Sequence, residues 1–99
     1  MPETLQAVID RALDAYSTLA ELGEEVDDEW SYVNDLTDAW RQRMSEVSDR
    51  RGTQPAPDAV GAAVDRAIAE IGLIADPHRA IDWLSTFPQV VLLALGENP

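Results

Sequence analysis

The sequence predicts an all-α fold, a helical bundle built on a long N-terminal helical hairpin with two or three shorter C-terminal helices. Apolar residues recur at alternating spacings of four and three from Leu5 to Val47, which is a helical period. The later apolar segments also have helical spacing, and no run shows the alternation expected of a strand. At 99 residues the chain has the length of one domain. We therefore expect a single helical domain over residues 1–99.

The first 51 residues carry a heptad pattern that two architectures share. One long helix would extend about 70 Å at about 1.5 Å per residue, whereas a hairpin over about residues 3–51 would fold back at Gly23. The pair Glu21 and Glu25 would repel in a continuous helix, and glycine is favoured where a helix ends. Asp27 or Asp28 could then cap the second helix. We favour the hairpin, with its stripe facing the core: Leu5, Ile9, Ala12, Tyr16, Leu19, Gly23, Val26, Trp30, Val33, Thr37, Trp40, Met44 and Val47.

The charge distribution also favours the hairpin. Residues 1–40 hold eleven acidic residues and one arginine, a net charge of −10, whereas residues 41–51 hold four arginines and two acids, a net of +2. Folding back would bring opposite charges together. The expected neighbours are Arg41 and Arg43 with Asp10 and Asp14, and Arg50 and Arg51 with Glu3.

A linker over residues 52–57, GTQPAP, separates the hairpin from C-terminal helices over about residues 58–96. Its two prolines and its glycine end one helix and permit another to begin. Asp76 followed by Pro77 is a strong helix start. Thr86 with Gln89 three residues later indicates a new cap, so we expect a turn before a last helix that ends at Gly96.

The composition excludes several kinds of chemistry. The chain has no cysteine and a single histidine, and its seven basic residues are all arginine. Thiol chemistry, Schiff bases and phosphate-loop lysines are therefore excluded, and we expect neither a catalytic site nor a cofactor. A net charge of −12 disfavours free nucleic acid. No apolar run is long enough to span a membrane and no signal peptide is apparent, which favours a cytoplasmic protein.

The stretch ELGEEVDDEW, residues 21–30, has six carboxylates and no basic residue. We expect these carboxylates to face water near the start of a helix. An alternative is a divalent-metal site, for which Glu24, Glu25 and Asp28 are the candidate ligands on one helical face. Their E-E-x-x-D arrangement is similar to half of the motif of the all-α nucleotide pyrophosphohydrolases, which implies a metal-dependent hydrolase. Those enzymes place E-x-x-D well downstream on a second helix, whereas D-L-T-D here follows at residues 35–38, so we do not assign this family.

The most informative apolar feature is the run from Val90 to Leu95 near the C-terminus, which leaves no polar face on the last helix. Such a helix is buried within the subunit or forms an interface. We expect a homo-oligomer, most simply a dimer, acting through protein contacts as an adaptor, regulator or accessory subunit. An alternative is an acidic decoy or antitoxin that covers a basic nucleic-acid-binding protein. The predicted interface residues are Val90, Val91, Leu92, Leu93, Leu95 and the off-stripe Tyr32.

Overall fold

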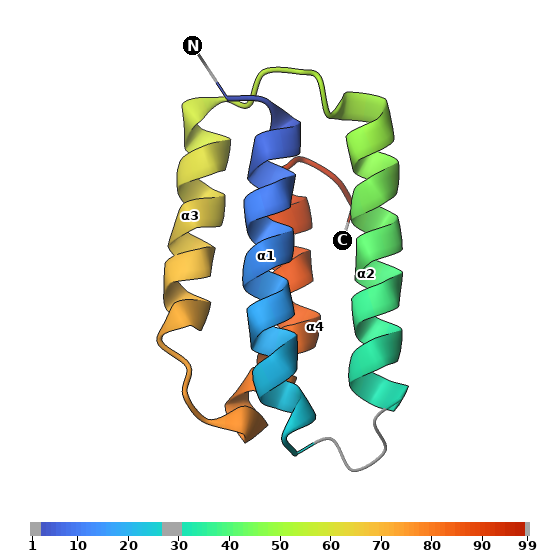
Figure 1. Ribbon diagram of the computed structural model, residues 1–99. Helices are drawn as coiled ribbons and strands as arrows, with labels where there is room; N and C mark the ends of the chain where they lie inside the picture. Colours follow the sequence, from blue (N-terminus) through green and yellow to red (C-terminus); the bar gives the residue numbers. More distant parts are fainter. Residues whose placement is uncertain (1–2, 27–30, 99) are drawn as a thin grey trace.

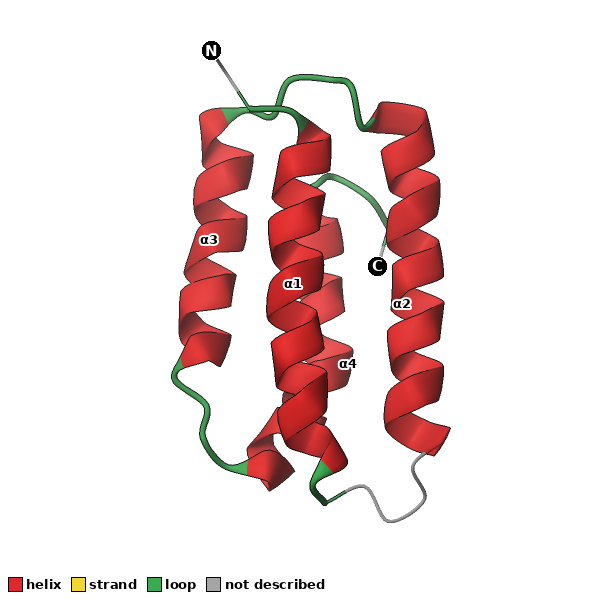
Figure 2. Cartoon of the chain, viewed as in Figure 1, coloured by secondary structure: helices red, strands yellow, loops and turns green. Residues whose placement is uncertain are grey.

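Four helices make up the fold, in a computed structural model that describes residues 3–26 and 31–98 (Figure 1). The described residues contain no strand (Figure 2), only an isolated bridge between Thr4 and Pro55. The prediction of an all-α bundle is therefore confirmed. The helices are α1 (Leu5–Glu24), α2 (Ser31–Arg51), α3 (Asp58–Gly72) and α4 (Pro77–Ala94).

Successive helices run antiparallel, and α1 and α4 form a central pair with α2 and α3 on opposite sides (Figure 1). Because α1 and α2 lie side by side, they form the predicted hairpin rather than one long helix. The predicted caps Asp27 and Asp28, and the stripe residue Trp30, lie outside the described residues. The hairpin supplies one side of the bundle, and the C-terminal helices complete it.

The core follows the predicted stripe. All of its described positions are buried except Val26, which is half-buried. Tyr16 of α1 and Trp40 of α2 meet Phe87 of α4, with ring centroids 4.3–6.3 Å apart. Aromatic pairs at this separation add to the stability given by apolar burial. The three rings therefore join the hairpin to the last helix.

Gly23 has a different role from the one predicted. It lies within the last turn of α1, is buried, and precedes the helix end at Glu24. A Cβ at this position would stand 3.2 Å from the Leu84 side chain and 3.3 Å from that of Ile81. The missing side chain thus lets the end of α1 approach α4 closely.

The last helix is continuous, so the predicted turn at Thr86 is wrong. Pro88 lies inside α4 and has no N–H to donate to the Leu84 carbonyl four residues earlier. The Tyr16 hydroxyl donates to that carbonyl at 2.9 Å and replaces the lost bond. Burial raises the pKa of Tyr16 to about 12, which keeps the hydroxyl protonated. A contact from α1 therefore allows α4 to continue through the proline.

Residues 52–57 cross over the start of α1 and satisfy its first backbone donors (Figure 1). The Leu5 N–H donates to the Gln54 carbonyl at 2.9 Å, and the Gln6 N–H donates to the Gly52 carbonyl at 3.1 Å. In return, the Ala56 N–H donates to the Glu3 carbonyl at 2.7 Å. Helix starts leave such donors without helical partners, so this crossing fixes the chain at that end of the bundle.

Candidate functional site

The acidic candidates lie at the end of α1. Glu24 is half-buried and Glu25 is exposed, while Asp28 lies outside the described residues. Glu24 borders a polar hollow of about 300 Å³ between α1 and α2, which Arg41 also lines. Nowhere in residues 3–26 and 31–98 do three or more metal-ligating side chains gather in a way that could hold an ion. Among the described residues, the hollow is lined mainly by polar side chains but has no set of ligands for a metal ion.

The arginines of α2 have other partners than those predicted. Arg41 donates to the Ser17 hydroxyl at 2.9 Å rather than lying against Asp10 or Asp14. Arg50 and Arg51 do not pair with Glu3, whose carboxylate is bound by Arg11 at 2.9 Å. The hairpin places opposite charges on neighbouring helices, as expected, but the side chains find partners that sequence spacing does not indicate.

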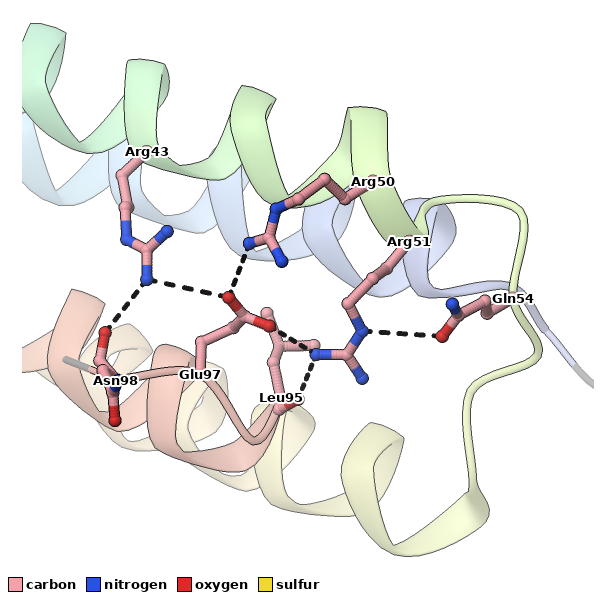
Figure 3. A network of polar contacts seen from close by, with 7 residues as sticks. All are labelled: Arg43, Arg50, Arg51, Gln54, Leu95, Glu97 and Asn98. Carbon is pink, nitrogen blue, oxygen red and sulfur yellow. Dashed lines mark hydrogen bonds and ion pairs between the residues drawn. The ribbon is translucent and has the colours of Figure 1, made fainter.

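Glu97 is the carboxylate that the arginines share (Figure 3). Its oxygens lie 2.7 Å from Nη2 of Arg50 and 2.6 Å from Nη1 of Arg51, with Nη2 of Arg43 at 3.7 Å. The Glu97 side chain is only 11% exposed. Hydrogen bonds from Arg50 and Arg51 lower the pKa of Glu97, so the carboxylate is held in its charged form.

The end of α4 places Glu97 at this position. Gly96 has φ of 79°, a left-handed conformation that favours glycine. The Gly96 N–H donates to the Leu93 carbonyl at 3.0 Å, and the Glu97 N–H donates to the Leu92 carbonyl at 2.9 Å. These two bonds are the Schellman arrangement of a helix end. The chain thereby turns back toward α2 and carries Glu97 to the arginines, and the predicted helix end at Gly96 is confirmed.

The predicted interface residues divide between the core and the surface. Val91, Leu92 and Leu95 are buried within the subunit, whereas Val90 is 37% exposed and Leu93 is 62% exposed. Tyr32, 45% exposed, begins α2 at the opposite end of the bundle from the end of α4 (Figure 1). Because the apolar run is helical, only Val90 and Leu93 of the predicted set face outward at the end of α4. Tyr32 is not part of that surface.

Among the described residues, the most exposed large apolar side chain is Leu73, which the sequence pattern did not predict as an interface residue. Leu73, 86% exposed, lies in the connection between α3 and α4 and lines a hollow of about 330 Å³ with Ile74 and Trp83. Val90 follows Trp83 by seven residues and therefore shares its helical face, and Leu93 is one turn further. The signal in the sequence was a large apolar residue directly after Gly72, beyond the helical pattern of α3. We call these residues the α4 surface: Leu73, Ile74, Trp83, Val90 and Leu93.

A second apolar hollow lies between α1 and α3, with a volume of about 400 Å³. Ile74 belongs to it as well as to the α4 surface, so the two adjoin at the α3–α4 connection. The lining of the hollow between α1 and α3 contains no charged residue, although the chain has a net charge of −12. Its lining is Ala15, Thr18, Leu19, Leu22, Ile68, Ile71, Gly72 and Ile74.

Comparison of the chain with protein-family models found no match, and comparisons with curated proteins and with solved structures found none either. Among the described helices, none combines the length and the apolar character that crossing a membrane requires. The function is therefore inferred from the residues of this chain alone.

Proposed function

We propose that this protein self-associates, most simply as a dimer, through the α4 surface and acts through protein–protein contacts rather than catalysis. One observation carries the proposal. Four large apolar side chains are exposed in the described residues, and three of them, Leu73, Val90 and Leu93, belong to the α4 surface. Trp83 lies along α4 between Leu73 and Val90, and apolar surface that continues over several residues is typical of interaction sites. A cytoplasmic location, as expected from the sequence, is part of the same proposal.

Charge supports this choice of surface. Residues 1–51 hold thirteen acids and five arginines, a net of −8, whereas residues 52–99 hold six acids and two arginines, a net of −4. A two-fold axis through the more acidic half would press like charges together. Glu70 and Arg79 both line the hollow beside Leu73. A two-fold contact here can therefore bring Arg79 of one copy to Glu70 of the other.

Light scattering after size exclusion tests the proposal on the wild type, Leu73→Asp and Leu93→Asp. The wild type should be a dimer. A carboxylate buried without a partner costs several kcal/mol, so either variant should dissociate at micromolar concentration. Because both leucines are largely exposed in the subunit, the variants should keep the helical circular dichroism of the wild type.

Tyr32→Asp is the matched control, since it introduces the same charge at an exposed apolar residue of α2, outside the α4 surface. This variant should remain a dimer. A monomeric wild type would refute self-association. A dimer that Tyr32→Asp alone disrupts would place the interface at the start of α2 instead.

A second candidate function is the capture of a basic protein, and the ion-pair pattern favours it. The described residues include sixteen acidic side chains, of which only Glu3, Asp65 and Glu97 lie within 4.0 Å of an arginine nitrogen. The other thirteen described carboxylates form no ion pair with an arginine and can attract a cationic surface. Complementary charge of this kind speeds association and is weakened by salt. A steep loss of partner binding with added salt would distinguish this function from apolar self-association.

A further inference from the structure

The end of α2 carries an excess of positive charge in an otherwise acidic molecule. Three guanidinium groups, those of Arg43, Arg50 and Arg51, converge on the single carboxylate of Glu97 (Figure 3). These four groups carry a net charge of +2. Glu46 and Asp49 lie on the same helix and are exposed, and within the described residues neither lies within ion-pair distance of these arginines. One carboxylate thus leaves the cluster electrostatically unbalanced.

The arginines also retain unused hydrogen-bond donors. Each guanidinium has five N–H groups in a planar fork. Arg50 uses Nη2 on Glu97, and Arg43 uses Nη2 on the Asn98 carbonyl at 3.1 Å. Arg51 uses Nη1 on Glu97 and on the Leu95 carbonyl, and Nε on Oε1 of Gln54 at 3.5 Å. A phosphate dianion offers two charges and at least three acceptor oxygens, so it matches three guanidinium groups better than one carboxylate does.

Glu97 can leave the cluster without disturbing the helix before it. Its backbone N–H is bonded to the Leu92 carbonyl within the Schellman turn, whereas, among the described residues, only arginines bind its side chain. Rotation of that side chain away from α2 would leave the turn and α4 intact. The arginine side chains are 29–55% exposed, so a ligand in solution can reach them.

We propose that Arg43, Arg50 and Arg51 form a binding site for a phosphate dianion, and that Glu97 occupies this site as an intramolecular competitor. A tethered group acts at an effective concentration of about millimolar or above. Free phosphate therefore binds weakly to the wild type and more tightly when Glu97 no longer competes. The phosphate can be the free ion or a group on another molecule, and the experiment separates these two sources.

Phosphate titration followed by the NMR signals of the arginine side chains tests the site, at constant ionic strength maintained with sodium chloride. Inorganic phosphate should bind Glu97→Gln at least tenfold more tightly than the wild type. Adding Arg50→Gln to that variant should remove the gain, because Arg50 supplies one of the charges. The matched control is Glu46→Gln, which removes an exposed carboxylate from the same helix and should leave phosphate affinity unchanged.

The wild type provides an independent measurement in case Glu97→Gln does not fold. High phosphate should shift the side-chain signals of Arg43, Arg50 and Arg51, and leave those of Arg66 and Arg79 in place. Phosphoserine is titrated in parallel, and the tighter of the two ligands identifies the source of the phosphate. Equal phosphate affinity in the wild type and Glu97→Gln would overturn the proposal. So would a response that all arginines share or that chloride alone reproduces.

Discussion

The two ends of the bundle differ in how completely their polar groups are paired. At the end where α2 finishes, the 52–57 linker bonds to the start of α1 and three arginines bind Glu97. At the end where α1 and α3 finish, Glu24 and Glu25 have no arginine within 4.0 Å in the described residues, and Leu73 is 86% exposed. The first end is closed by contacts within the chain, and the second presents unpaired charge and apolar surface.

This difference bears on the stability of the two ends. Paired groups at the first end hold Glu97, the 52–57 linker and the start of α1 in place, so changes there should lower the free energy of unfolding. Unpaired carboxylates and exposed apolar side chains contribute little to the stability of the fold. Residues of this kind are typical of sites that serve function rather than folding. We therefore expect equivalent substitutions at the two ends to have opposite or very unequal effects on stability.

The largest effect is expected for Gly52→Ala at the closed end. A Cβ on Gly52 would overlap the Ser48 carbonyl oxygen and stand 2.9 Å from Oε1 of Gln6. Relief requires residue 52 to move away from Ser48 of α2 and from Gln6 of α1. Overpacking of this kind costs about 1–3 kcal/mol, so the melting temperature should fall by about 5–15 °C. Thermal unfolding followed by circular dichroism measures the change.

Gly72→Ala is the matched control at the open end. Among the described residues, no atom outside its chain neighbours and its own helix backbone lies within 4 Å of a Cβ at this position, and Gly72 is the last residue of α3. Alanine should be neutral or should stabilise the protein by up to about 1 kcal/mol. A loss of stability at Gly72 as large as that at Gly52 would contradict the contrast between the two ends.

The pH dependence of stability should also originate largely at the closed end. The pKa of Glu97 is lowered in the folded protein by hydrogen bonds from Arg50 and Arg51. Its contribution is therefore present above the unfolded-state pKa of about 4.3 and is lost as pH falls through the lower folded-state pKa. Glu97→Gln should cost about 1–2 kcal/mol at pH 7, and the cost should shrink below about pH 4.

Urea unfolding of the wild type and Glu97→Gln between pH 7 and pH 3 measures how the difference in their free energies of unfolding shrinks as the pH falls. Glu46→Gln, which removes a carboxylate without an ion pair among the described residues, should change stability by less than about 0.5 kcal/mol. Parallel curves for the wild type and Glu97→Gln across the whole range would show that the arginines do not stabilise the charged form of Glu97.

The sequence predicts the helices and the core well because both depend on local spacing. The stripe from Leu5 to Val47 identifies buried positions of α1 and α2, and Asp76 with Pro77 marks the start of α4. These signals act between residues a few positions apart, where one helical face or one cap decides the outcome. These spacing and capping signals can be recognised without knowing how the helices pack.

The remaining features depend on residues far apart in the chain. Where α4 continues through Pro88, Tyr16 binds the Leu84 carbonyl, which is 68 residues away in the chain. The arginines at the end of α2 find Glu97, which is 46–47 residues beyond Arg51 and Arg50. Helix packing decides which side of the last apolar run is buried. Such partners are set by the packed fold, and spacing along one helix does not indicate them.

The smallest effect is expected at the acidic end of α1, for the double variant Glu24→Gln with Glu25→Gln. Neither carboxylate has an arginine within 4.0 Å among the described residues, so stability should change by less than about 0.5 kcal/mol. Millimolar magnesium or manganese should shift the melting temperatures of the wild type and this variant equally. Specific metal binding would instead stabilise the wild type by about 2.7 kcal/mol at a hundredfold excess over Kd. If that stabilisation is seen and the variant abolishes it, these carboxylates bind metal and the hydrolase interpretation must be restored.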